Sequence, residues 1–433
     1  MTKKVPVVTV AERDEAARLA GLPVEATLAL TDVAGAIREG LLAFSAATGL
    51  LVMRQMMEGE LTARIGPKHA KLPDRVGNWH GTTTGSVVMG GRKLPVERPR
   101  GRNRDSAEIE LDTWATFSSE ELLCQLVVER MLAGVATRRH VDVAEPLGAD
   151  VEAKATATSK SAVSRRFVTA TEHALEQLLG RDLSELEAAV LMVDGLDVAG
   201  ACVVAALVIT ADGTKVPVGL WLGDTENKTV VTAVLADMVD RGLCFDNGLL
   251  VVLDGARALA AGVRKVFGER AVIQRCVLHK RRNVSGHLPD ELAHTIDRRL
   301  ALAFGDPDWR RGLAAAKSIA ASLDANHPNA AGSLREGLED MFTVRRLGIS
   351  GRLALTLTST NPIESMISIG RTTMGRVKKW KDGSMKKRWC AAGMLEAERS
   401  FRRVKGHAEM PKLIAALRHH TNPATSTKYD QAA

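Results

Sequence analysis

The chain has 433 residues, of which 45% are hydrophobic, and it carries a formal net charge of +8. That length exceeds one ordinary hydrophobic core, so we expect several domains, and the basic excess suits a polyanionic partner. The five cysteines include no Cys-x-x-Cys pair, which argues against a disulfide framework. The longest apolar stretch that stands out, residues 199–210, is too short to cross a bilayer. The sequence therefore predicts a soluble intracellular protein with no membrane partner.

The first part of the chain is predicted to be helical and to end in a basic hairpin. Apolar residues recur at helical spacing over residues 25–66. Gly90-Gly91 is then predicted to form the turn between two strands. From Gly91 to Arg104 there are six basic residues and only one acidic residue. The hairpin is either a solvated loop or a DNA contact. Its candidate contacts are Arg92, Lys93, Arg98, Arg100 and Arg102.

Two further helices are expected, one over residues 119–141 that Ser119 caps and one that contains SKSAVSRRF. In the second helix, Val163 and Phe167 face inward. A small polar start followed by a basic exposed face is typical of a recognition helix in DNA-binding proteins. It is equally the pattern of any amphipathic helix with a basic face. The exposed face consists of Lys160, Ser164, Arg165 and Arg166.

After residue 188 the chain changes to short apolar runs rich in β-branched residues. Five such runs alternate with helical stretches in the order β-β-β-α-β-α-β. Ala211-Asp212-Gly213 is the turn between the second and third runs. This order predicts a mixed α/β sheet that begins antiparallel and continues with helical crossovers. Residues 288–350 look wholly helical, so a helical block is predicted to be inserted late in the α/β domain.

The C-terminal stretch is strongly basic. Residues 365–405 hold twelve Lys and Arg against three acids, with Trp380 and Trp389 among the bases. Such interleaving suits phosphate contact and base stacking. The candidate contacts are Arg371, Lys378, Lys379, Lys381, Lys386, Lys387 and Arg388.

Three acids follow apolar runs or begin a helix, and each has a purely structural interpretation. Asp194 ends the first run in LMVDG and could belong to a turn. Asp254 ends the fourth run but precedes a helix, which places it where α/β folds bind ligands. Glu364 falls at the third position of a helix that Asn361 caps and Pro362 opens, a capping-box arrangement.

Together the three acids suggest a metal site. If the first and fourth strands are neighbours, Asp194 and Asp254 project side by side, and Glu364 can face them. Clustered carboxylates repel, so they need cations, and hard oxygen ligands select Mg²⁺ or Mn²⁺. Two such ions, roughly 3.5–4 Å apart, support phosphodiester chemistry without a nucleophilic side chain. The single tyrosine, Tyr429, lies four residues from the end, which argues against a tyrosine recombinase.

Several long segments resemble the Mutator-type DDE transposases of bacterial insertion sequences. They are VLDGARALAAGVRKVFGERAVIQRCVLHKRRNVSGHLP, VDG with the later GDTEN, TNPIES, and VKKWKDGSMKKRW, and they occur in the family's order between about residues 80 and 417. The resemblance implies an RNase H-like domain whose metal-binding triad is Asp194, Asp254 and Glu364. The spacings are 254 − 194 = 60 and 364 − 254 = 110 residues, and the longer gap accommodates the helical insertion.

The resemblance also implies a function. The protein would bind the terminal inverted repeats of its element in double-stranded DNA, cleave strands with two Mg²⁺ or Mn²⁺ ions, and join the freed 3′-OH to target DNA. It would need no nucleotide cofactor, would act as a dimer or larger assembly, and would be cytoplasmic and nucleoid-associated in a bacterium. The alternatives are a non-catalytic DNA-binding regulator derived from a transposase and an RNase H-fold nuclease.

Cys276 and His279 form a Cys-x-x-His pair that matches a motif of the same family. Zinc needs three or four protein ligands, and the sequence offers no second pair at suitable spacing. The pair is either structural or part of the active site, where His279 would contact a scissile phosphate or orient a triad carboxylate. The basic neighbours that would then follow the DNA backbone are Arg275, Lys280, Arg281 and Arg282.

We therefore expect a mixed α/β, RNase H-like protein with a late all-helical insertion, preceded by a mainly helical DNA-binding region. The expected segments are a helical region (1–80), a DNA-binding region (81–180), the first part of the catalytic core (181–287), the helical insertion (288–358), the last core helix with basic C-terminal helices (359–417), and a disordered tail (418–433).

Overall fold

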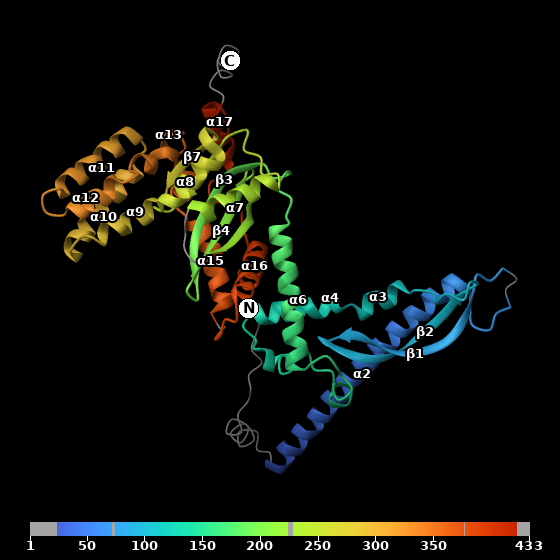
Figure 1. The fold of residues 1–433 in the computed structure, drawn as a ribbon. Helices are drawn as coiled ribbons and strands as arrows, with labels where there is room; N and C mark the ends of the chain where they lie inside the picture. Colours follow the sequence, from blue (N-terminus) through green and yellow to red (C-terminus); the bar gives the residue numbers. More distant parts are fainter. Residues whose placement is uncertain (1–23, 72–73, 224–227, 376, 422–433) are drawn as a thin grey trace. The chain divides into compact units, whose positions relative to one another are not determined.

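The computed structural model describes residues 24–71, 74–223, 228–375 and 377–421, with side chains described from residue 37 onward except Lys228. The chain divides into two compact units, Met1–Thr169 and Ala170–Ala433, here called the N-terminal and C-terminal units (Figure 1). Helices and one mixed sheet dominate the C-terminal unit, so the predicted α/β class is confirmed.

A two-stranded hairpin and one long helix form the frame of the N-terminal unit. The hairpin consists of β1 (Gly77–Met89) and β2 (Arg92–Asn103), which pair antiparallel. Gly90 and Gly91 both have positive φ, 56° and 76°, which only glycine adopts without strain, so the predicted turn is confirmed. Met57, Leu61 and Ile65 of helix α2 (Val24–Ile65) pack with Val87 and Val96 of the hairpin.

One stretch of α2, Ile37–Ile65, is long and apolar enough by length and composition to cross a membrane, and 11% of its most apolar window is buried. The expectation that residues 199–210 form the longest apolar segment is therefore wrong. A helix that packs against its own unit passes the same test, and the C-terminal half of α2 does pack in that way. Ile37, Leu41 and Phe44 are more than 60% exposed on its N-terminal half.

The remaining helices of the N-terminal unit are short until the last. They are α3 (Asp112–Ser118), α4 (Glu120–Leu132), the 3₁₀ turn η1 (Thr137–Arg139) and α5 (Ala149–Glu152). Ser119 caps α4 as predicted, since its side chain accepts from the Glu121 N–H. The helix ends at Leu132 and not near residue 141, because Gly134 has a φ of 91° and breaks it. Helix α6 (Lys160–Leu179) runs across the boundary between the units.

A five-stranded sheet forms the centre of the C-terminal unit, with strand order β5-β4-β3-β6-β7. β3, β4 and β5 are antiparallel, whereas β6 and β7 run parallel to β3. The predicted order of strands and helices is confirmed. The bounds are β3 (Ala188–Val198), β4 (Ala201–Thr210), β5 (Lys215–Gly223), β6 (Leu249–Leu253) and β7 (Ala271–Arg275).

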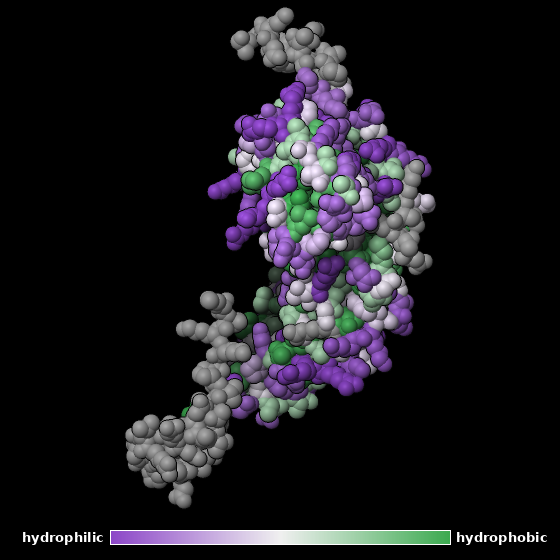
Figure 2. All heavy atoms as spheres, turned by 90° about the vertical axis from the view of Figure 1, so that its left-hand side faces the viewer, coloured by the Kyte–Doolittle hydropathy of each residue, from purple (hydrophilic) through white to green (hydrophobic). Residues whose placement is uncertain are grey.

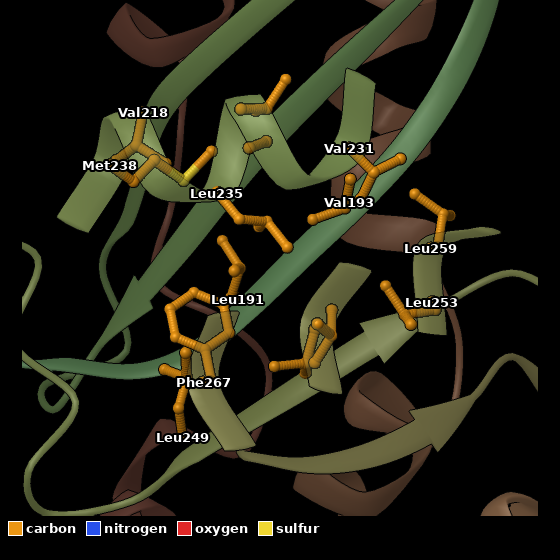
Figure 3. Close-up of a cluster of buried hydrophobic side chains, with 14 of the residues drawn as sticks. Leu191, Val193, Val218, Val231, Leu235, Met238, Leu249, Leu253, Leu259 and Phe267 are labelled. Carbon is orange, nitrogen blue, oxygen red and sulfur yellow. The ribbon is translucent and has the colours of Figure 1, made fainter. Parts of the chain in front are cut away.

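Helices α7 (Lys228–Asp240) and α8 (Arg257–Phe267) supply the crossovers and pack on one face of this sheet. Figure 3 shows Leu191 and Val193 of β3 pointing into the same cluster as Leu235 of α7 and Phe267 of α8. Fully burying each such side chain contributes about 1.5–3 kcal/mol. The cluster therefore fixes the register of β3 beside β6.

Helices α15 (Asn361–Met374) and α16 (Gly383–Arg399) contact strands β3, β4 and β5. Successive side chains of a strand point to opposite faces, so Met192 and Asp194 point away from the cluster that holds Leu191 and Val193. Asp194 is therefore directed to the face opposite α7 and α8. The strand continues past it to Val198, so the alternative that Asp194 belongs to a turn is wrong.

The block between β7 and α15 is helical, as predicted. It comprises α9 (Val277–Ser285), α10 (Asp290–Gly305), α11 (Trp309–Leu323), α12 (Pro328–Arg335), η3 (Glu339–Phe342), α13 (Thr343–Arg346) and α14 (Gly351–Leu357). Leu300, Phe304 and Phe342 belong to a hydrophobic core of its own. The outer face of this block is mostly hydrophilic in Figure 2.

A buried amide joins this helical block to the edge of the sheet. Gln274 of β7 is fully buried and its side chain donates to the Met341 carbonyl at 2.9 Å, while it accepts from the Val344 N–H at 2.9 Å. Helix α17 (Met410–Thr421) ends the described chain, so residues 418–421 of the predicted disordered tail (418–433) are helical instead, and the rest of that tail lies outside the described residues. The short turns η2 (Gly268–Arg270) and η4 (His407–Glu409) complete the fold.

Candidate active site

Two of the three acids come from adjacent parallel strands. Val193 of β3 lies opposite Leu253 of β6, so Asp194 and Asp254 are the next residues of neighbouring strands. The Gly195 N–H donates to Asp194 Oδ1 at 3.0 Å, and the Ala256 N–H donates to Asp254 Oδ1 at 2.8 Å. These local hydrogen bonds restrict both side chains. The structure thus brings together two residues that lie sixty positions apart in the sequence.

The third acid, Glu364, lies in the first turn of α15, the helix that contacts β3. Thr360, not Asn361, is the N-cap, so Glu364 comes one position later than predicted and forms no capping box. The Glu364 N–H donates to the Thr360 carbonyl at 2.9 Å, and the Thr360 hydroxyl donates to Glu364 Oε1 at 2.5 Å. The carboxylate is therefore held by the residue that starts its own helix.

Cys276 and His279 lie beside Glu364. Cys276 is the N-cap of α9, so His279 falls in the first turn of that helix, three residues on. His279 Nδ1 is 4.0 Å from Glu364 Oε1. One ligand atom of each of Cys276, His279 and Glu364 lies within 4.8 Å of the others. The third potential ligand of this group is thus Glu364, which the sequence analysis assigned to the acidic triad and not to the Cys-x-x-His pair.

Backbone hydrogen bonds connect the three segments that carry these residues. The Cys276 N–H donates to the Leu253 carbonyl at 2.7 Å, next to Asp254. The Val277 N–H donates to the Thr358 carbonyl at 2.9 Å, two residues before Thr360. The ends of β6 and β7 and the start of α15 are therefore fixed to one another.

The electrostatics of Asp194 reflect the nearby acids. Its side chain is 8% exposed, and burial together with the negative charges of Asp254 and Glu364 raises its pKa to about 6, while His279 opposes the shift. A carboxyl whose ionisation is disfavoured by burial and like charges is stabilised by a cation.

Cys276 and His279 influence each other. Burial disfavours the thiolate, but hydrogen bonds from His279 and Thr360 lower the pKa of Cys276 below its usual value. The hydrogen bond with Cys276 and the charges of Cys276, Glu364 and Asp194 raise the pKa of His279 to about 9, against the effect of burial. Its acidic neighbours and Cys276 therefore favour the cationic form of the His279 imidazole.

The donor set fits a hard divalent cation. Asp194, Asp254 and Glu364 offer only carboxylate oxygens, which Mg²⁺ and Mn²⁺ prefer. The adjacent thiol and imidazole would suit a softer ion, but the Thr360 hydroxyl lies 3.4 Å from Cys276 Sγ, 3.3 Å from His279 Nδ1 and 2.5 Å from Glu364 Oε1. That oxygen occupies the space between the three donors, so the group does not enclose an open metal position.

Many of the predicted DNA contacts are paired with acids inside the protein. Ion pairs join Arg92 to Glu152, Lys93 to Glu120, Arg98 and Arg100 to Glu108, Arg166 to Glu120, Arg275 to Asp340, Arg281 to Asp297 and Arg388 to Glu172. Lys280 is 2% exposed, and its ammonium donates to the Ser333 carbonyl at 2.6 Å. These side chains stabilise the fold in this conformation.

Other predicted contacts remain accessible. Lys160, Ser164 and Arg165 are exposed on α6, whereas Val163 and Phe167 are buried as predicted. Lys386 is half-buried and donates to the Ala199 carbonyl at 3.0 Å, and Trp389 is buried, which excludes it as a free stacking platform. Arg102 and Lys387 are half-buried, and the remaining exposed candidates are Arg282, Arg371, Lys378, Lys379 and Lys381.

Thr360 is the residue of this site that sequence reasoning missed. The only signal was its position directly before a predicted helix start, and both Thr and Asn are favoured N-caps.

GDTEN, one of the segments that carry the family resemblance, has residues 224–227 outside the described residues.

The chain is similar in sequence to known transposases. Residues 31–380 match the sequence model of a family described as "Transposase, Mutator family". A probable transposase for an insertion sequence element of Corynebacterium diphtheriae is 24% identical over 200 residues, which are 46% of this chain and 57% of the relative.

Two shorter matches name the same class of protein. A probable ISRM3-like transposase of Sinorhizobium fredii is 35% identical over 74 residues, 17% of this chain and 18% of the relative. The ISRM3 transposase of Rhizobium meliloti is 28% identical over 114 residues, 26% of this chain and 28% of the relative. The chain therefore matches just over half of the first relative and less than a third of the other two.

Proposed function

The chain belongs to the Mutator family of transposases, and from this premise we propose that it is a DNA transposase with a DDE active site. It would bind the terminal inverted repeats of an insertion sequence, cleave DNA strands and join the freed 3′-OH to target DNA. The observation that carries this proposal is the convergence of Asp194 on β3, Asp254 directly after the adjacent β6, and Glu364 on α15, which contacts β3.

The three carboxylates would hold divalent cations, two Mg²⁺ or Mn²⁺ ions per site. When bound, such ions supply activation of a water or 3′-hydroxyl and stabilisation of the leaving oxygen. Asp194 and Asp254 are restrained by local amides, and Glu364 by Thr360, so the ligands are preorganised. One phosphodiester is exchanged for another in joining, which is why no nucleotide cofactor is needed.

His279 would act beside this triad. Its side chain is 28% exposed, its pKa is raised to about 9, and it lies near Glu364 and Asp194. A cationic imidazole there can donate a hydrogen bond to a scissile phosphate. An alanine at this position that leaves strand transfer at the wild-type rate in a folded protein would remove this role.

The fold supports an RNase H-like assignment. Three antiparallel strands are followed by two parallel ones, as that fold has them. One acid lies on β3, one directly after the adjacent β6, and a glutamate lies on a helix after the insertion. The segment scheme given above is proposed on the same basis, with its last helical segment extended to Thr421.

The DNA contacts are proposed for the exposed basic residues. Lys160 and Arg165 lie on α6, which is proposed as the recognition helix, with Ser164 between them. Arg282, Arg371, Lys378, Lys379 and Lys381 would contact the phosphate backbone near the active site. The protein would act in the bacterial cytoplasm on nucleoid DNA, as a homodimer or larger assembly because two element ends must be paired.

The decisive experiment is a cleavage and joining assay on DNA that carries the element's flanking repeats, with Mg²⁺ or Mn²⁺. Wild type is compared with Asp194→Ala, Asp254→Ala and Glu364→Ala, and DNA binding is measured for each. We expect joining in wild type only, with binding retained in all. Binding without chemistry in wild type would favour a regulator, and cleavage without joining would favour a nuclease.

A further inference from the structure

The Thr360 side chain is at the centre of the active-site cluster, although no chemistry has been assigned to it. The residue is fully buried, and its hydroxyl lies within hydrogen-bond distance of three different functional groups. The nearest is Glu364 Oε1 at 2.5 Å, followed by His279 Nδ1 at 3.3 Å and Cys276 Sγ at 3.4 Å.

A count of protons gives these contacts a direction. A threonine hydroxyl has one proton to donate and two lone pairs. The carboxylate of Glu364 is the nearest acceptor and carries charge, so it takes this proton. The thiol sulfur of Cys276 receives the Thr360 backbone N–H instead, at 3.4 Å. The hydroxyl oxygen keeps its lone pairs, and His279 Nδ1 lies 3.3 Å from it, so Thr360 connects His279 to Glu364.

The contact with Thr360 is what restrains the Glu364 carboxylate. Glu364 is 32% exposed at its side chain and has more rotatable bonds than an aspartate, so without a partner it would sample several rotamers. Thr360 binds Glu364 twice, through its carbonyl to the Glu364 N–H and through its hydroxyl to Oε1. The second oxygen, Oε2, is then available to a cation.

We propose that Thr360 is a positioning residue whose hydroxyl fixes the Glu364 carboxylate for metal binding and connects it to His279. The inference rests on the proposed function, since it assumes that Glu364 is a metal ligand. Groups that orient metal ligands typically contribute 10–100-fold to metal affinity or activity.

The test compares Thr360→Ala and Thr360→Val, which lack the hydroxyl, with Thr360→Ser, which keeps it. The matched control is Thr358→Ala, because Thr358 is 7% exposed and its hydroxyl donates to the Ala354 carbonyl, away from the cluster. Mn²⁺ binding to the full chain is measured without DNA by the electron paramagnetic resonance signal of free Mn²⁺. Thermal unfolding in EDTA reports whether each variant is folded.

We expect Thr360→Ala and Thr360→Val to weaken Mn²⁺ binding by roughly 10–100-fold, and Thr360→Ser and Thr358→Ala to stay within about threefold of wild type. If one hydroxyl-free variant fails to fold, the other carries the comparison, and the serine variant shows whether the hydroxyl alone suffices. Wild-type affinity in both hydroxyl-free variants, or a loss in the serine variant equal to that in alanine, overturns the proposal. Absence of Mn²⁺ binding in wild type and in Glu364→Ala alike would instead overturn the metal site itself.

Discussion

Replacing Asp194 with asparagine should stabilise the metal-free protein while it abolishes activity. Asp194 is 8% exposed and adjacent to Asp254, and its pKa is raised from 3.8 to about 6. When the pKa of a carboxyl is higher in the folded protein than in the unfolded chain, its contribution to folding stability is fully present below the unfolded-chain pKa. That contribution is lost as the pH rises through the pKa of the folded protein. Above pH 6 the wild type therefore bears a repulsive, buried charge that asparagine removes.

The size of the effect follows from the shift. The pKa of Asp194 differs by about two between the unfolded and folded states, and each unit is worth about 1.36 kcal/mol. The Asp194 charge therefore destabilises the fold by roughly 3 kcal/mol at pH 8 and by about half of that at pH 5. For a unit of this size, that is a rise of roughly 5–10 °C in the unfolding temperature. The Gly195 N–H still finds an oxygen acceptor on asparagine, so that backbone donor stays paired.

The assay is thermal unfolding in EDTA at pH 8 and pH 5, repeated with Mn²⁺ added. Asp212→Asn serves as the control of opposite sign. Hydrogen bonds from Thr210 and Thr214 lower the pKa of Asp212 to about 2, so asparagine there should destabilise at pH 8, with the loss disappearing as the pH approaches 2. A lower unfolding temperature for Asp194→Asn at pH 8, or a gain that is equal at pH 5 and pH 8, would refute the reasoning.

Three further predictions concern the site and its supports. Thr360→Ala removes the oxygen that lies between the three donors, so Co²⁺ should be able to bind Cys276. Binding is seen as a near-ultraviolet thiolate-to-cobalt absorption band, which wild type and a Thr360→Ala/Cys276→Ser double variant should lack. A band of equal strength in wild type would contradict the placement of that hydroxyl. Gln274→Leu should lower the free energy of unfolding, measured by urea titration, by about 2–4 kcal/mol, because the buried Val344 N–H and Met341 carbonyl lose their partner. A change below about 0.5 kcal/mol would show that the amide does not join the helical block to the sheet. Arg165→Ala should weaken binding to the repeat ends without affecting unfolding, since Arg165 is exposed, and unchanged affinity in a gel-shift titration would exclude α6 as the recognition helix.

The fold was predictable where local pattern determines it. The five apolar runs became β3 to β7 in the expected order, because buried strands flanked by glycine turns carry their own signal. Gly90 and Gly91 specified the hairpin turn for the same reason. The sequence analysis placed Asp194 at the end of a strand because Gly195 follows it. The strand in fact continues, since apolar residues alternate again at Leu196 and Val198 and pairing with β4 extends to Val198.

Long-range pairing was not predictable. The basic hairpin looked like a DNA surface because Glu108, Glu120 and Glu152, which neutralise its charges, come from later segments. The role of Thr360 depends on three segments that meet only in the folded chain. The proximity of the three acids could be expected from the apolar runs before Asp194 and Asp254, the helix start before Glu364 and the family resemblance, but the sequence could not reveal that Thr360 contacts Glu364.

Cysteine substitution of one triad residue tests the central claim most directly, because a thiolate discriminates against Mg²⁺ and accepts Mn²⁺. Strand joining by Asp254→Cys is measured in each metal beside wild type. Cys244→Ser, which replaces an exposed cysteine that precedes β6, is the reactivity control. If Asp254 binds the metal directly, the variant is inactive with Mg²⁺ and regains joining with Mn²⁺, while wild type works with both. Joining at the wild-type rate with Mg²⁺ would show that Asp254 is not a metal ligand and would contradict the account.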